Sequence, residues 1–153
     1  MDILLSDVDE AKLKTAVAEL LGVGYLTRAE PAARFPVRGA VYGRLERVMV
    51  NLVVQRPATG LCVNVIFLVD TGSAFTYLTP LAFEALGFAD SVPSTAVLSV
   101  HGVALTVSPS RAHFCDANVL GQDFFRDGRV DLLVQHSRAD KSVWLRRPVR
   151  RGR

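Results

Sequence analysis

A nine-residue apolar run, LCVNVIFLV at positions 61–69, ends at an aspartate and constrains the fold more than any other segment. Apolar side chains that point to both faces of a strand are typical of a strand buried between other layers of structure. Asn64 is the one polar residue in the run, and Asp70, Thr71, Gly72 and Ser73 follow it directly.

The polar residues after this run form a candidate site. A carboxylate at the end of a buried strand is costly unless hydrogen-bond donors surround it. Thr71 and Ser73 offer hydroxyls, and Gly72 lets the backbone turn so that an N–H can face Asp70. A simple turn that ends the strand would use the same residues. The segment is therefore consistent with a structural turn and with a site built on one carboxylate.

The first 34 residues are expected to form an amphipathic helix and a proline-containing linker. The helix is predicted over residues 6–21, with Ser6 or Asp7 as its N-cap and Gly22 at its end. The apolar residues expected on one face of this helix are Leu13, Val17, Leu20 and Leu21.

Beyond residue 35 the hydrophobic period changes from 3.6 to 2, which predicts an all-β domain with two or three short helices. Residues 37–54 fit one long or bent strand, with Gly39 and Gly43 as places for a bulge. The other predicted elements are a helix starting at Thr79 and Pro80, a hairpin over 96–107 turning at His101 and Gly102, a strand within 112–125 leading to a glycine turn, and closing strands at 129–135 and 142–146.

Composition and charge exclude several classes of function. A chain of 153 residues, half of them apolar, fits one compact domain. The sequence shows no signal peptide and no membrane span, so we expect a soluble intracellular protein of the cytoplasm. The net charge of +3 comes from the C-terminus, since the last eight residues hold five of the 18 basic residues and leave 13 against 15 acidic ones. We expect a solubilising basic tail over 148–153, with no membrane partner and no nucleic-acid partner.

Other candidate sites have weaker support. Cys62 and Cys115 are expected to be reduced core thiols. His101, His113 and Cys115 lack a fourth zinc ligand, so no metal is expected. No signature of a nucleophilic serine or cysteine occurs, and no cofactor is called for. The aspartates expected to cap the turn after the late glycine are Asp123 and Asp127.

Two motifs stand about fifty residues apart, separated by the predicted helix and hairpin. The first joins the apolar triplet FLV to the DTGS of residues 70–73. The second, ANVLGQDFF, contains Val119, Leu120 and Gly121. In this order the chain resembles the retropepsin-like aspartic proteases, the single-lobe, retroviral type of the family. The resemblance covers residues 35–147 and leaves out the N-terminal helix with its linker and the basic tail.

The resemblance implies a closed barrel-like lobe that dimerises, so that two copies of Asp70 meet. Such a dyad shares one proton, activates a water and hydrolyses a peptide bond of a peptide or protein substrate, without metal or cofactor. In the family, Thr71 bonds across the dimer, Gly72 contacts the substrate backbone, and Ser73 donates to the outer oxygen of Asp70. Val119, Leu120 and Gly121 cross behind the active-site loop.

The sequence leaves two questions open. Family members close a glycine-bearing hairpin over the substrate, and the 96–107 hairpin fits such a flap or a pair of body strands; the second choice leaves only a stunted flap over 88–96. The alternative to an endopeptidase is a catalytically silent domain of the same fold that binds peptides or partners, and either could derive from a retroelement polyprotein.

Overall fold

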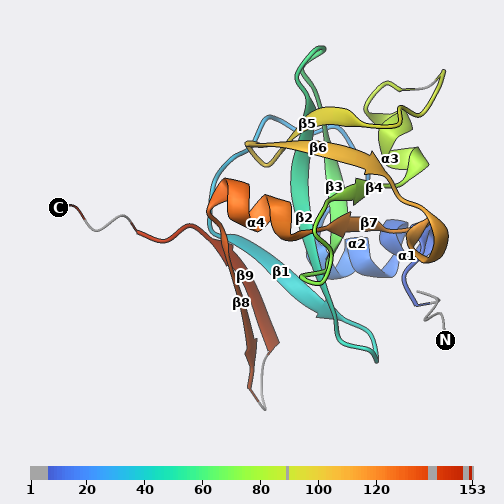
Figure 1. The fold of residues 1–153 in the computed structure, drawn as a ribbon. Coiled ribbons are helices and arrows are strands. Elements are labelled where there is room, and N and C mark those ends of the chain that lie inside the picture. Colours follow the sequence, from blue (N-terminus) through green and yellow to red (C-terminus); the bar gives the residue numbers. More distant parts are fainter. Residues whose placement is uncertain (1–6, 89, 138–140, 150–151, 153) are drawn as a thin grey trace.

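The computed structural model describes residues 7–88, 90–137, 141–149 and 152. Its centre is a closed barrel in which six strands follow the order β3, β7, β4, β6, β5 and β2, and β2 pairs with β3 to close the ring. Three further strands extend the sheet from β2 in the order β1, β9, β8, and the β8–β9 hairpin projects from the barrel (Figure 1). The expectation of an all-β fold with short helices is confirmed.

The long hairpin of β2 (Arg47–Arg56) and β3 (Leu61–Val69) forms one wall of the barrel, with eight residue pairs in register from Met49–Leu68 to Arg56–Leu61. The two faces of β3 contribute to two different clusters of buried side chains. Val65 and Phe67 lie in the main core inside the barrel, whereas Ile66 and Leu68 lie in a second cluster with the N-terminal helices. The run at 61–69 is apolar on both faces because each face is covered.

The N-terminal segment forms two short helices, α1 (Glu10–Lys14) and α2 (Ala16–Leu21), instead of the one predicted helix. Thr15 interrupts them: its backbone leaves the helical region and its hydroxyl donates to the Ala11 carbonyl at 2.8 Å. Asp9 is the N-cap, Ser6 lies outside the described residues, and Gly22 ends α2 in the left-handed conformation as predicted. Leu20, predicted on the buried face, is 50% exposed.

The predicted strand over 37–54 is wrong in one respect, since the chain turns back between β1 (Val37–Tyr42) and β2. Gly43 and Glu46 have φ angles of 74° and 52°, which reverse the chain within four residues. Gly39 lies inside β1 and marks a close approach, because a Cβ there would lie 2.6 Å from the Met49 carbonyl oxygen.

The middle of the chain forms most of the remaining barrel. The elements are β4 (Tyr77–Leu78), α3 (Pro80–Ala85) with the predicted Thr79 cap, β5 (Ala96–Val100) and β6 (Val103–Pro109). The predicted turn at His101 and Gly102 is confirmed. Because β5 pairs with β2 and β6 pairs with β4, this hairpin belongs to the barrel wall and does not form a flap.

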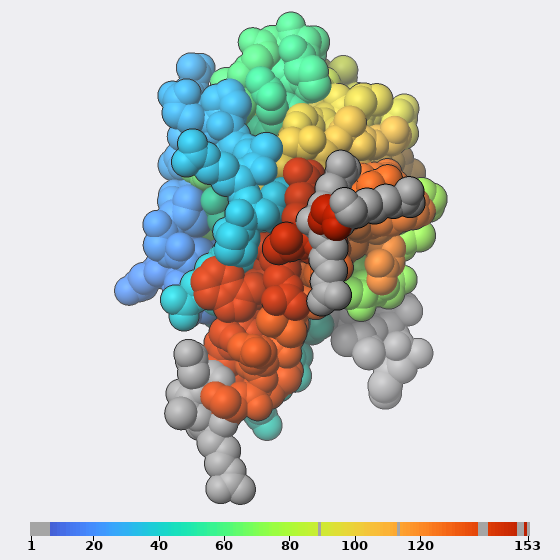
Figure 2. Space-filling model, turned by 90° about the vertical axis from the view of Figure 1, so that its left-hand side faces the viewer, coloured from blue at the N-terminus to red at the C-terminus, as the bar shows by residue number. Residues whose placement is uncertain are grey.

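The last third confirms a strand within 112–125 that leads to Gly121, but this strand is short and a helical turn precedes it. It contains a 3-10 turn, η1 (Ala112–Phe114), then β7 (Asn118–Leu120) and α4 (Gln122–Gly128). β8 (Asp131–His136) and β9 (Lys141–Arg146) are the predicted closing strands, and β9 pairs with β1. Figure 2 shows the early, blue-to-cyan segment and the late, orange-red segment side by side on one face of the molecule. No helix in the described ranges is long and apolar enough to cross a membrane.

Candidate active site

Asp70 lies directly after β3, at the point where β7 runs parallel to that strand. The register places Phe67, Leu68 and Val69 beside Asn118, Val119 and Leu120. The ladder continues into the site, because the Asp70 N–H donates to the Leu120 carbonyl at 3.0 Å. Asp70 is half-buried, and its backbone N–H is fixed by β7.

The loop after Asp70 folds back toward its carboxylate. The Gly72 N–H donates to Asp70 Oδ1 at 2.9 Å, and the Ser73 N–H donates to the Asp70 carbonyl at 3.1 Å. A Cβ on Gly72 would lie 3.2 Å from that carboxylate oxygen, so glycine permits a close approach here. The Ser73 hydroxyl donates to the Phe75 carbonyl at 2.7 Å and not to Asp70. The predicted serine-to-aspartate hydrogen bond is therefore absent from this single chain.

A buried pair of polar side chains braces the loop from behind. Thr76 Oγ1 donates to Asp123 Oδ1 at 2.7 Å and accepts from the Gly121 N–H at 3.1 Å. Asp123 also accepts from the backbone N–H groups of Thr76 (3.2 Å) and Phe124 (2.8 Å). Asp123 is 4% exposed and serves as a bridge between the loop and α4, whereas Asp127 is exposed and pairs with Arg126 at 2.9 Å. Asp123 therefore does bind a backbone N–H in the turn after Gly121, although the N-cap position of α4 is Gly121 itself, whereas the prediction that Asp127 caps this turn is not met.

Backbone groups at the start of α4 complete this attachment. The Gln122 N–H donates to the Ser73 carbonyl at 2.8 Å, and its side-chain amide donates to the Thr71 carbonyl at 2.9 Å. The Asp123 N–H donates to the Ala74 carbonyl at 3.2 Å. The loop is thus attached to the β7–α4 junction at Thr71, Ser73, Ala74 and Thr76.

Gly121 is needed for the two segments to come this close. A Cβ at this position would lie 2.1 Å from the Phe75 carbonyl oxygen and 2.5 Å from its carbonyl carbon. Val119 and Leu120 are both buried, and Val119 also pairs with Tyr77. The structure therefore brings together the two predicted sets of residues, 70–73 and 119–121.

A hollow of about 410 Å³ opens in front of Asp70. Its lining comes from the 70–73 loop, β4, β7 and the segment that includes η1: Asp70, Gly72, Ser73, Tyr77, Arg111, Phe114 and Val119. Of these residues, Tyr77, Arg111 and Phe114 had no place in the site predicted from the sequence. The one sequence signal for the bridge was Asp123 itself, an acidic residue two places after Gly121 and directly before two phenylalanines.

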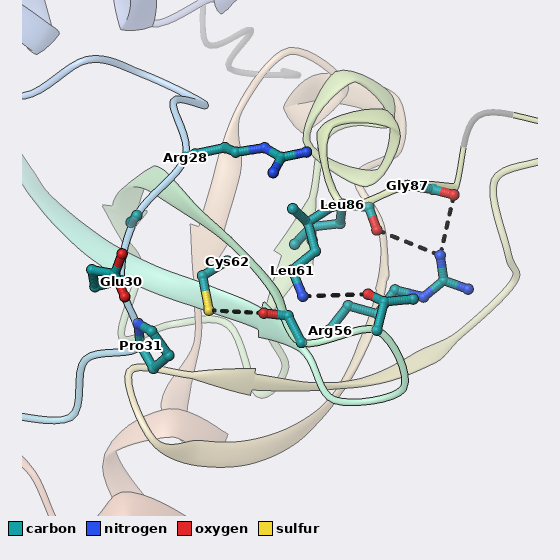
Figure 3. A pocket seen from close by; sticks show the side chains of 11 residues that line it. Arg28, Glu30, Pro31, Arg56, Leu61, Cys62, Leu86 and Gly87 are labelled. Carbon is teal, nitrogen blue, oxygen red and sulfur yellow. Dashed lines mark hydrogen bonds between the residues drawn. The ribbon is translucent and has the colours of Figure 1, made fainter.

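A larger hollow, about 720 Å³, lies at the opposite end of β3 (Figure 3). Cys62 is one of its lining residues, and it lies eight residue steps along the strand from Asp70, a distance of roughly 25 Å. Arg56 donates there to the carbonyls of Leu86 (3.4 Å) and Gly87 (3.1 Å), and its guanidinium lies 3.8 Å from the ring centre of Phe88. These contacts hold Arg56 against the end of α3, so we assign this hollow a structural role.

The remaining titratable candidates have structural surroundings. His101 is 7% exposed, and its Nε2 lies 2.8 Å from the Arg34 carbonyl while its Nδ1 accepts from the Val53 N–H at 3.4 Å. Burial lowers the pKa of His101. Burial raises the pKa of the Cys62 thiol. Cys115 is exposed, so the expectation that it is a core thiol is wrong. Both cysteines are free, and the described residues contain no group of three or more side chains suited to a metal.

Comparisons of the chain with protein-family models, with curated proteins and with solved structures gave no match.

Proposed function

We propose that this chain is a single-lobe, retropepsin-like aspartic endopeptidase that acts as a homodimer. The observation that carries the proposal is the junction behind Asp70, in which β7 and Gly121 pass beneath the 70–76 loop and fix it through Thr76 and Asp123. A plain turn at the end of a strand does not need a second, distant segment with a buried carboxylate to hold its shape. Such bracing is useful where one carboxylate must be held in a fixed position.

The chemistry follows from two Asp70 side chains that meet across a two-fold axis. Like charges about 3 Å apart do not both ionise, so the pair holds one proton and titrates in two coupled steps. The ionised carboxylate takes a proton from a water, which attacks the scissile carbonyl, and the protonated carboxyl donates to the carbonyl oxygen. Collapse of the tetrahedral intermediate breaks the C–N bond. The carboxyl that took the proton from the water passes it to the leaving nitrogen, and the hydroxyl formed from the carbonyl oxygen returns its proton to the other carboxylate.

In this mechanism the loop residues position the carboxylate. The Gly72 N–H donates to one oxygen of Asp70 and leaves the other oxygen for the dyad and water. The Thr71 carbonyl is held by Gln122, and its exposed side chain is available to the second protomer. General acid–base catalysis by positioned groups contributes about 10²- to 10⁴-fold in rate.

One observation favours the second candidate function, a domain that binds peptides without cleaving them. The β5–β6 hairpin is part of the barrel wall, so only the segment around residues 88–95 is left to act as a flap. A site without a closing cover excludes water poorly and holds substrate less firmly. The endopeptidase and the peptide-binding domain predict different results when the wild type is compared with Asp70→Asn.

The test is the cleavage of a diverse peptide library by the wild type and by Asp70→Asn, from about pH 4 to pH 7 and at two enzyme concentrations. Asp127→Asn serves as the matched control, because Asp127 is an exposed aspartate on α4 whose recorded partner is Arg126. We expect cleavage that vanishes with Asp70→Asn, persists in Asp127→Asn and rises faster than linearly with enzyme concentration. Folded wild-type protein that binds peptides but cleaves none supports the binding domain instead.

A further inference from the structure

The hollow in front of Asp70 holds a second charge. Arg111 lines it together with three residues that offer mainly apolar surface, Tyr77, Phe114 and Val119. Among the lining residues Asp70 and Arg111 are the two with formal charges, and they have opposite signs. A substrate side chain that enters this hollow therefore meets a carboxylate, a guanidinium and two aromatic rings.

Arg111 is exposed and unpaired within the described part of the chain. Its guanidinium forms no ion pair or side-chain hydrogen bond with the described residues, whereas the guanidinium of Arg47 binds Asp7 and that of Arg126 binds Asp127. A guanidinium presents its N–H groups in a planar fork that matches a carboxylate in two parallel hydrogen bonds. The free charge on a residue that lines the same hollow as the candidate catalytic group is thus suited to an anionic partner.

The backbone that carries Arg111 is fixed. The preceding residue, Ser110, is buried, its N–H donates to the Leu78 carbonyl at 2.7 Å, and its hydroxyl donates to the Ala117 carbonyl at 2.6 Å. The Arg111 carbonyl accepts from the Phe114 N–H at 3.2 Å. The guanidinium therefore starts from a defined point on the rim, which reduces the entropy lost when it binds a ligand.

We propose that Arg111 is a specificity-determining residue that selects peptides with a glutamate or aspartate side chain close to the scissile bond. The inference rests on the proposed endopeptidase function and names its substrate class. The dyad carries a negative charge in its active form, so it repels an acidic side chain bound nearby. Arg111 compensates that repulsion and binds the carboxylate, while Tyr77 and Phe114 pack against the methylene groups that carry it.

The test compares peptides that are identical except for Glu, Gln or Lys at one position, scanned over the four positions nearest the bond that the wild type cleaves. At one of these positions we expect kcat/KM to be roughly tenfold higher for Glu than for Gln in the wild type. The preference should disappear in Arg111→Gln, reverse toward Lys in Arg111→Glu and survive in Arg111→Lys. Arg44→Gln is the matched control, since Arg44 is an exposed arginine in the β1–β2 turn, and it should keep the wild-type preference.

A second measurement separates failure of the inference from failure of the proposed function. The same peptides, labelled with fluorescein, are titrated against Asp70→Asn with and without Arg111→Gln, and binding is followed by anisotropy. Cleavage by the wild type without a Glu preference at any position overturns the role of Arg111 and leaves the endopeptidase intact. If the wild type cleaves nothing, a Glu preference in binding that Arg111→Gln removes supports the acidic selectivity alone, and equal binding of Glu and Gln peptides overturns it.

Discussion

Replacement of Thr76 by valine tests how far the buried bridge behind the loop determines stability. Valine has nearly the volume of threonine, so the change removes the hydroxyl without opening a large cavity. The hydroxyl donates to the Asp123 carboxylate at 2.7 Å and accepts from the Gly121 N–H at 3.1 Å. A hydrogen bond to a charged group contributes about 1.5–3 kcal/mol, and a buried N–H left without an acceptor costs about 1–3 kcal/mol.

The two losses together predict that Thr76→Val lowers the free energy of unfolding by about 2.5–6 kcal/mol, a large part of the 5–15 kcal/mol typical of a domain. Urea unfolding followed by circular dichroism at one fixed protein concentration measures this change. With a slope of about 2 kcal/mol/M, the midpoint should fall by roughly 2 M. The control is Thr106→Val, which makes the same change at an exposed position of β6 and should stay within about 0.5 kcal/mol of the wild type.

A double-mutant cycle locates the effect. Thr76→Val and Asp123→Asn should couple by about 0.5–3 kcal/mol, because each change removes part of the same hydrogen-bond network. Equal midpoints for Thr76→Val and Thr106→Val, or additive effects in the cycle, would refute the assignment of this bridge as the brace of the loop.

Three other changes test separate features of the site and core. Gly121→Ala should destabilise the fold by about 1–3 kcal/mol or more, because its Cβ would meet the Phe75 backbone at 2.1 Å; a urea midpoint equal to that of the wild type contradicts this. The wild type should lose stability as the pH falls from 7 through the folded-state pKa of His101, which burial holds below its ordinary 6.5, since the unfolded chain takes up a proton that the folded chain resists. His101→Gln should flatten that part of the curve of unfolding free energy against pH, by at most about 1.4 kcal/mol per pH unit, and an unchanged slope assigns the pH dependence to other groups. Ser73→Ala should leave the acid limb of the cleavage pH profile in place, since its hydroxyl donates to Phe75; a shifted limb would show that the hydroxyl binds Asp70 in the dimer.

The sequence predicted the meeting of two distant segments better than it predicted the local structure around them. The resemblance implied that residues 119–121 cross behind residues 70–73, and β3 and β7 do run side by side. The position of Asp123 gave one signal, but its partner Thr76 could not be predicted, since a single sequence does not show which residue 47 positions away shares its buried space.

The predicted boundaries of helices and strands were wrong where a single residue determines the backbone conformation. The helix break at Thr15 and the turn at Gly43 both lie within segments whose hydrophobic period continues across them. Arg111 escaped notice for a different reason. Its proposed role depends on its place in the hollow of Asp70, just before the 3-10 turn at 112–114, and the sequence predicted no turn there.

The parallel pairing of β3 with β7 also sets the order in which the molecule can be completed during synthesis. Phe67 cannot pair with Asn118 until Asn118 has been synthesised. In the same way, Thr76 cannot bond to Asp123 until Asp123 has been added to the chain. Contacts this distant in sequence form late and slowly, whereas the β2–β3 hairpin can form as soon as its turn is made. A nascent chain therefore carries Asp70 for some fifty residues of translation before β7 holds it in position. Under the proposed endopeptidase function, we expect this delay to keep the newly made chain inactive toward its own unfolded segments until the fold is complete.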